Sequence, residues 1–245
     1  MLSKSQIKLI TSLQQKKYRT KYKLFVVEGK KSVLEFLKSN YELEILYATE
    51  SFVNPMPNLK EDKEYIITNN ELKKISSLKN PTEILAVFRL SEKKHTVESD
   101  LTLVLDAVQD PGNLGTIIRL CDWFGIKSIV CSPTTVDCYN PKVVQATMGS
   151  LTRVSVVYTD LETYLTNTTL PIYASLLDGE NIYKTKLPKK ALIIMGNEGK
   201  GISKELIALA TNSLNIPHFG EQQDTESLNV ATATAVLLSE FCRGK

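Results

Sequence analysis

From residue 101 onward, short apolar segments alternate with segments of helical spacing, and this alternation restricts the possible fold more than any other feature of the chain. The expected strands are 101–107, 128–131, 154–158, 172–176, 191–195 and one that ends at Ile216. The expected helices begin near Asn113, at Asn140–Pro141, at Ser203 and at about Ser227. Strands that alternate with helices form a largely parallel sheet covered on both faces. The sequence therefore predicts an α/β fold for this part of the chain.

The first 95 residues predict a second, smaller α/β domain. Its expected helices cover residues 4–15, the neighbourhood of 33–37, and 70–76. Its expected strands are 24–27, 43–48, 64–67 and 84–88. Residues 91–99, with the sequence SEKKHTVES, are polar and lie between apolar strands, which is typical of a linker. The predicted domains are therefore residues 1–95 and 96–245.

Composition excludes several classes of protein. Hydrophobic residues make up 42% of the chain, which is enough for a packed core. No apolar run approaches the about 20 residues that span a bilayer, and the N-terminus lacks the apolar stretch of a secretory signal. The four cysteines include no CxxC pair and the chain has only two histidines, which argues against structural zinc and disulfides. We expect a cytoplasmic protein with no membrane segment and no metal.

Positive charge is concentrated at the N-terminus. Residues 1–31 carry a net charge of +8, which leaves −5 for the rest of a chain whose total is +3. The nine basic residues are Lys4, Lys8, Lys16, Lys17, Arg19, Lys21, Lys23, Lys30 and Lys31. Clustered Lys and Arg neutralise phosphates, and Tyr18 and Tyr22 among them are suited to stacking on bases. A solvated helix face explains the charge equally well.

Asn113 and Arg119 stand six positions apart near the start of a predicted helix. The planar guanidinium of arginine, with its five N–H donors, suits phosphate and ribose oxygens. The alternative is an ordinary helix arginine that pairs with Asp122 or Asp106.

A glycine-rich loop, GNEGKG, follows the predicted strand 191–195. It is no P-loop, because Ile202 stands where Lys is needed, and no dinucleotide fingerprint, because Lys204 stands at the third glycine position. Its glycines allow the backbone to approach a ligand closely, and Glu198 adds a specific acceptor. A tight turn between a strand and a helix is the alternative interpretation.

The third motif leads from Ile216–Pro217 to the residues SLNVA at 227–231. Ser227 is a plausible N-cap, which is a structural function. Asn229 is harder to explain structurally, because the small residues that follow it allow this helix to approach another backbone at a ligand or a subunit interface.

Taken together and in this order, the three motifs resemble those of the SpoU (TrmH-like) branch of the SPOUT RNA methyltransferases. The resemblance implies a homodimer whose C-terminal domain has a parallel sheet and a deep trefoil knot, with S-adenosylmethionine as methyl donor. It implies cofactor contacts at Leu176, Gly196, Gly201, Ile216, Pro217 and Leu228. It implies catalytic or substrate-orienting positions at Asn113, Arg119, Glu198, Ser227 and Asn229.

Residues 1–95 resemble, more weakly, the substrate-binding domain of many of these enzymes, whose α/β fold is similar to that of certain RNA-binding ribosomal proteins. The resemblance rests on Arg19, on FVVEG at 25–29, and on Pro81 with ILAV at 84–87. One departure lies at residues 220–226, which are a few residues longer than the usual connection to Ser227.

The function that the resemblance implies is methylation of a ribose 2′-hydroxyl in structured RNA, with 23S ribosomal RNA favoured. A transfer RNA methyltransferase, a non-catalytic RNA-binding protein on this fold, and base methylation as in another SPOUT branch are the alternatives. The family's proposed base corresponds to Arg119. Because an arginine pKa above about 12 makes a poor base, we expect Arg119 to act with the substrate phosphate, while Ser227 and Asn229 position the ribose.

Overall fold

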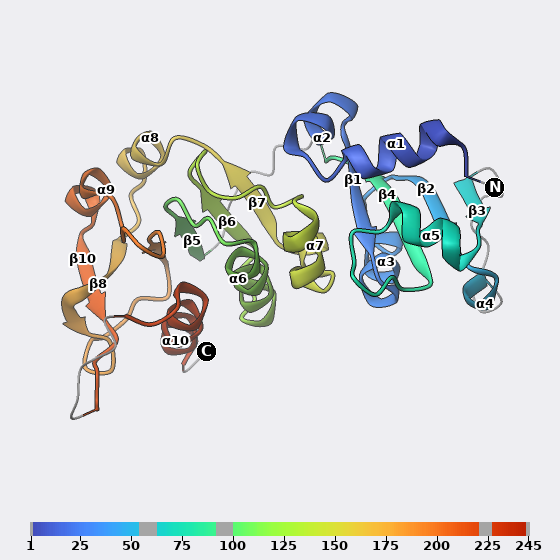
Figure 1. Cartoon of the computed structure of the whole chain (residues 1–245). Coiled ribbons are helices and arrows are strands. Elements are labelled where there is room, and N and C mark those ends of the chain that lie inside the picture. Colours follow the sequence, from blue (N-terminus) through green and yellow to red (C-terminus); the bar gives the residue numbers. More distant parts are fainter. Residues whose placement is uncertain (1, 54–62, 92–99, 221–226, 244–245) are drawn as a thin grey trace. The chain divides into compact units, whose positions relative to one another are not determined.

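The computed structural model describes residues 2–53, 63–91, 100–220 and 227–243 (Figure 1). The chain forms two compact units, and the first is not one continuous stretch. Unit 1 contains Met1–Lys93 and Asp137–Thr152, and unit 2 contains Lys94–Val136 and Arg153–Lys245. The predicted boundary between residues 95 and 96, and all but the first residue of the predicted linker 91–99, lie outside the described residues. Both stay predictions.

Unit 1 is built on a sheet of four strands in the order β1-β4-β2-β3, and all four strands were predicted. They are β1 (Leu24–Glu28), β2 (Leu43–Ala48), β3 (Glu64–Ile66) and β4 (Ile84–Arg89). β4 pairs antiparallel with β1 and β2, and β3 pairs parallel with β2. β1 is buried along its whole length, which agrees with its continuous apolar sequence.

The helices of unit 1 are α1 (Lys4–Ser12), α2 (Lys16–Tyr22), α3 (Lys30–Leu37), α4 (Glu50–Val53), α5 (Asn69–Ile75) and α7 (Pro141–Thr147). Capping boxes begin two of them, with Ser3 and Gln6 at α1 and Thr68 and Glu71 at α5. α1 and α5 share one apolar core with side chains of β1 and β4. Leu13, the C-cap of α1, belongs to this core. α7 begins at Asn140–Pro141, as predicted.

The segment Asp137–Thr152 packs within unit 1 through aromatic contacts. The rings of Tyr139 and Phe25 have centroids 4.6 Å apart, and the hydroxyl groups of Tyr139 and Tyr41 are 3.1 Å apart. Burial raises the pKa of Tyr41 to about 12, so the hydroxyl stays protonated and can donate this bond. A segment that follows the first strands of unit 2 in sequence therefore belongs to the core of unit 1.

Unit 2 has a sheet of six strands in the order β10-β8-β9-β5-β6-β7, and every neighbouring pair is parallel. The strands are β5 (Leu101–Leu105), β6 (Ser128–Cys131), β7 (Ser155–Tyr158), β8 (Ile172–Asn181), β9 (Ala191–Met195) and β10 (Asn212–Asn215). This confirms the predicted parallel α/β sheet. β8 runs five residues beyond its predicted end at Leu176.

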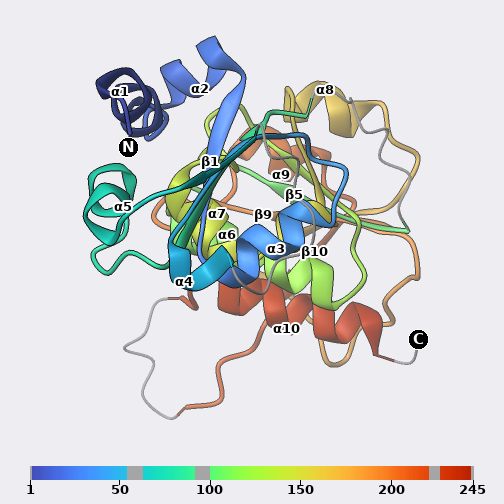
Figure 2. The same ribbon diagram turned by 90° about the vertical axis from the view of Figure 1, so that its right-hand side faces the viewer.

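Helices cover both faces of this sheet (Figures 1 and 2). α6 (Pro111–Trp123) and α10 (Val230–Cys242) pack together on one face, and α8 (Leu161–Thr166) and α9 (Lys204–Leu209) pack together on the other. A core that includes Val104, Ile172 and Ile194 lies beneath α8 and α9. Within the described ranges, no helix has the length and apolar character needed to cross a membrane.

One predicted helix start is wrong. α10 begins at Val230, and its N-cap is Asn229 rather than Ser227. The side-chain oxygen of Asn229 accepts hydrogen bonds from the backbone N–H groups of Ala231 and Thr232, at 2.9 and 3.3 Å. One carboxamide oxygen thus satisfies two of the unpaired donors at the helix start. Ser227 and Leu228 precede the helix in chain without regular secondary structure.

Candidate active site

The candidate site lies where the order of the strands reverses. From β5, the chain adds β6 and β7 on one side of the sheet and places β8, β9 and β10 on the other. β5 and β9 are neighbours in parallel register, with Leu105 opposite Met195, so their carboxyl ends meet at one edge. Open parallel sheets bind ligands at this kind of crevice. The segment leading into α6 follows β5, and the glycine loop follows β9.

Glu198, in the glycine loop, is held by the start of α6. Its carboxylate accepts hydrogen bonds from the backbone N–H groups of Gln109 and Asp110, both at 3.2 Å, and from the side-chain amide of Asn113 at 3.0 Å. Burial raises the pKa of Glu198, but these hydrogen bonds outweigh burial and bring the pKa below its ordinary value. Glu198 is therefore an ionised acceptor at neutral pH.

Asn113 connects Glu198 to the start of α10. Its Nδ2 donates to Glu198, and its Oδ1 accepts a 2.9 Å hydrogen bond from Nδ2 of Asn229. An ionised carboxylate can only accept, so the amide nitrogen of Asn113 must face Glu198 and the oxygen must face Asn229. The oxygen of Asn229 is already committed to capping α10. The charge on Glu198 thus fixes the orientation of the Asn113 amide, and the cap of α10 fixes that of Asn229.

Asn197, which the sequence analysis passed over, shapes the glycine loop. Its Nδ2 donates to the carbonyl oxygen of Ala107 at 2.7 Å, and its Oδ1 accepts from the N–H groups of Gly199 and Lys200 at 3.0 Å. Asn197 and Gly201 also exchange two backbone hydrogen bonds of 2.9 Å. Asparagine commonly closes a turn through its own side chain, and that was the available sequence signal.

Two glycines of this loop are required for different reasons. Gly201 has φ of +72°, which favours glycine. A Cβ on Gly196 would lie 2.3 Å from the carbonyl carbon of Gly201, so the closing backbone of the loop itself excludes a side chain there. Beside the loop, Ala107 adopts φ of +56° although it is not glycine. Such conformations cluster at functional sites.

Arg119 lies on α6 and is exposed. Within the described part of the chain it makes no hydrogen bond or ion pair, whereas Asp122 is bound by Arg153 at 2.8 Å and Asp106 accepts from the N–H of Ser203. The two carboxylates that an ordinary structural arginine would use are therefore engaged elsewhere. Arg119 makes no hydrogen bond to Glu198 either, so its guanidinium remains available to a substrate.

The residues expected at the cofactor lie on neighbouring strands or in the segments that follow them. Leu176 is on β8 and Gly196 directly follows β9, two residues past the paired Ala174 and Ile194. Ile216 and Pro217 directly follow β10, where the side chain of Asn215 donates to the carbonyl oxygen of Leu177. Leu228 is 49% exposed, one residue before the cap of α10. Ser227, beside it, is also exposed and makes no hydrogen bond to the described residues.

Sequence and structure comparisons identify the family to which these elements belong. The SpoU rRNA methylase family matches residues 100–239, and an MRM3-like substrate-binding domain matches residues 4–86. The chain belongs to the SpoU family. It is an S-adenosylmethionine-dependent RNA methyltransferase of the ribose 2′-O class.

Three relatives match almost the whole chain. The 23S rRNA (guanosine(2553)-2′-O)-methyltransferase RlmP of Bacillus subtilis is 33% identical over 232 residues, which are 92% of this chain and 91% of that protein. A TrmH-family RNA methyltransferase structure from Porphyromonas gingivalis has a TM-score of 0.89 and 40% identity, and covers 98% of both chains. The S-adenosylmethionine-bound rRNA methyltransferase structure from Sinorhizobium meliloti has a TM-score of 0.87 and 28% identity, covering 99% of this chain and 97% of that one.

The residues at the strand ends suit this cofactor. Apolar side chains such as Leu176, Ile216 and Leu228 are of the kind that packs against a flat adenine, and glycine backbone allows close approach. A Cβ added to Gly201 would meet no atom within 4 Å, so open space lies beside the loop. The bound cofactor supplies a methyl group already activated on a sulfonium.

Proposed function

We propose that the chain methylates a ribose 2′-hydroxyl of 23S ribosomal RNA, with Arg119 as the group that engages the reacting nucleotide. The observation that carries this proposal is the contrast at the site. Asn113 binds both Glu198 and Asn229, whereas Arg119 has no partner among the described residues. The similarity to RlmP over nearly the whole of both chains supports ribosomal RNA as the substrate.

The protein's task in this reaction is alignment and loss of one proton. Holding the 2′-oxygen in line with the activated methyl group converts a bimolecular step into one within a complex. A guanidinium has five N–H donors and no acceptor, so Arg119 acts as a donor. It binds a phosphate oxygen of the substrate, which takes the hydroxyl proton, and it stabilises the charge that develops on the 2′-oxygen.

Glu198, Asn113 and Asn229 form the wall that orients this reaction. Their mutual hydrogen bonds fix the start of α6 relative to the start of α10. We propose that Ser227, exposed and next to this wall, binds the ribose together with Asn229. We also propose that Leu176, Gly196, Gly201, Ile216, Pro217 and Leu228 bind the cofactor, that the C-terminal part of the chain is knotted, and that no metal takes part.

We also propose that two copies of the chain form a homodimer. Trp123 at the end of α6 is 84% exposed, although tryptophan is among the residues that gain most from burial. The end of α10 lies beside it, since the thiol of Cys242 is 3.9 Å from the backbone oxygen of Phe124. We propose that the face of α6 and α10 around Trp123 is the homodimer interface. The expected location is the cytoplasm, with the ribosomal RNA.

Mass spectrometry of nucleosides tests the proposed function. Ribosomal and transfer RNA from cells with and without the gene should differ in one 2′-O-methylated nucleoside of 23S RNA, and the purified chain with S-adenosylmethionine should restore it. A missing methyl group in transfer RNA would replace the substrate, and a methylated base would overturn the assignment to the ribose.

A further inference from the structure

The lysines of α2 make no ion pair with an acidic residue in the described part of the chain. No Asp or Glu precedes Glu28 in the sequence, and Glu28 is itself buried, where its carboxylate accepts hydrogen bonds from Ser76 and Ser77. The lysines on and beside α2, in contrast, are exposed; they are Lys16, Lys17, Lys21 and Lys23. Such a surface attracts polyanions.

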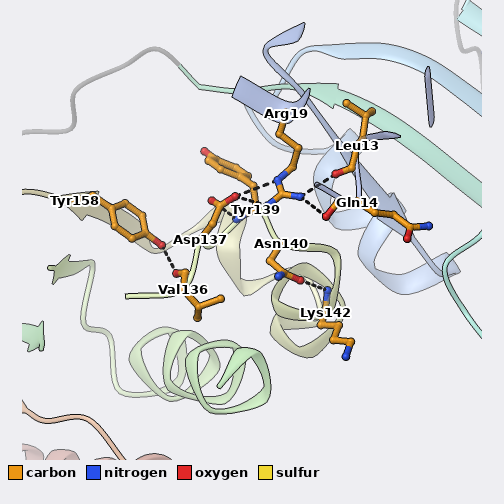
Figure 3. Close-up of polar contacts among 9 residues, drawn as sticks. All are labelled: Leu13, Gln14, Arg19, Val136, Asp137, Tyr139, Asn140, Lys142 and Tyr158. Carbon is orange, nitrogen blue, oxygen red and sulfur yellow. Dashed lines mark hydrogen bonds and ion pairs between the residues drawn. The ribbon is translucent and has the colours of Figure 1, made fainter. Parts of the chain in front are cut away.

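Arg19 is the exception among the nine basic residues, because its side chain is buried. Its exposed fraction is 2%. Its Nε and Nη2 donate to Oδ2 of Asp137 at 3.0 and 2.6 Å, and its Nη1 donates to the carbonyl oxygens of Leu13 and Gln14 at 2.8 and 2.9 Å (Figure 3). Arg19 therefore anchors α2 within unit 1, and the lysines remain for a ligand.

Two aromatic rings lie among these lysines. The rings of Tyr18 and Tyr22 are nearly parallel, at an angle of 11° with centroids 6.2 Å apart, and Tyr22 is 39% exposed. The ammonium of Lys17 is 4.8 Å from the centre of the Tyr18 ring, and that of Lys21 is 5.4 Å from the centre of the Tyr22 ring. Each tyrosine thus has a positive charge over its ring.

A nucleotide has the complementary pair of groups, because its flat base can stack on a tyrosine ring and its phosphate can bind an ammonium. We propose that α2 binds unpaired RNA nucleotides, with Tyr18 and Tyr22 stacking on bases and Lys17 and Lys21 contacting phosphates. A base offers its face to an aromatic side chain only where it is not stacked in a duplex, so the expected ligand is a loop or bulge. This inference rests on the proposed function, because it assumes that the chain acts on RNA.

The test is binding of the full chain to a short single-stranded RNA, to the same RNA as a duplex, and to an abasic version. Replacing both rings, Tyr18→Leu with Tyr22→Leu, should weaken binding of the single strand by about tenfold or more. Binding of the duplex and of the abasic strand should be unchanged. Tyr18→Phe with Tyr22→Phe keeps both rings and should bind normally.

The contribution of the lysines is measured separately, from the salt dependence of RNA binding. Lys17→Gln with Lys21→Gln should reduce the dependence of log affinity on log salt by about 1.4, because each single-strand phosphate contact contributes about 0.7. Tyr65→Leu is the matched control, since Tyr65 is 43% exposed in the same unit but lies between Glu64 and Ile66 on β3. It should bind like the parent chain.

Unchanged affinity for the single strand after loss of both rings would overturn the stacking surface, as would an equal loss for the duplex. Weak binding by the Tyr→Phe pair would overturn it too, because the rings are kept. These outcomes are independent of catalysis, since binding is measured without S-adenosylmethionine. A chain that binds through α2 but transfers no methyl group would refute the proposed function alone.

Discussion

Glu198 accepts a hydrogen bond of 3.0 Å from the side-chain amide of Asn113, and its negative charge decides which way that amide points. The bond joins the loop after β9 to the helix after β5, two elements 85 residues apart in sequence. The oxygen of Asn113 is thereby left to accept from Asn229, which caps α10.

This dependence predicts that the pair tolerates exchange better than replacement of Asn113 alone. Asn113→Asp places two carboxylates together and removes the donor, so stability should fall by about 1–3 kcal/mol. Adding Glu198→Gln restores a donor toward position 113 but loses the acceptor for the Asp110 N–H, so only part of the lost stability should return. Urea unfolding of the single and double variants measures this coupling. Strictly additive losses would show that the bond does not organise the wall.

Asn229 has two functions that one substitution separates. Asn229→Asp keeps a good N-cap but loses the amide that donates to Asn113, so the melting temperature should change little while methyl transfer falls strongly. Asn229→Ala removes the cap as well and should cost about 1 kcal/mol of stability. Ser227→Ala is the control for capping and should leave stability intact. Normal transfer by Asn229→Asp would mean that this amide serves the fold only.

Gly196 and Gly199 lie in the same loop, but replacement by alanine should have different effects at the two positions. A Cβ at Gly196 would lie 2.3 Å from backbone, whereas at Gly199 the nearest atom is Oδ1 of Asn197 at 3.8 Å. Gly196→Ala should therefore distort the loop, destabilise the chain by about 1–3 kcal/mol or more, and weaken cofactor binding in calorimetry. Gly199→Ala should bind normally. Equal affinity of both variants for S-adenosylmethionine would contradict this reading of the loop.

Trp123 should report on dimerisation. If the α6–α10 face joins two copies, Trp123→Glu should give a monomer in analytical ultracentrifugation and reduce methyl transfer. Because Trp123 is the only tryptophan, its fluorescence in the parent chain should also change as the dimer is diluted. A variant that stays dimeric would place the interface elsewhere.

The sequence predicted the elements better than the contacts between them. Continuous apolar runs identified β1, β5 and β9, because a strand buried on both faces needs them. Asn113, Glu198 and Asn229 could be named as site residues, but not their mutual bonds. The Arg19–Asp137 pair spans 118 residues and has no local signal. For the same reason, the packing of Asp137–Thr152 within unit 1 could not be predicted from periodicity.

Single-turnover methyl transfer by Arg119→Ala tests the central claim most directly. Arg119 is exposed and has no partner within the described residues, so its loss should leave the melting temperature and cofactor affinity unchanged. Transfer to 23S ribosomal RNA should fall by about 100-fold or more, and Arg119→Lys should recover little, because a point charge cannot replace a planar fork. Near-normal transfer by Arg119→Ala would contradict the account, and so would a collapsed melting temperature.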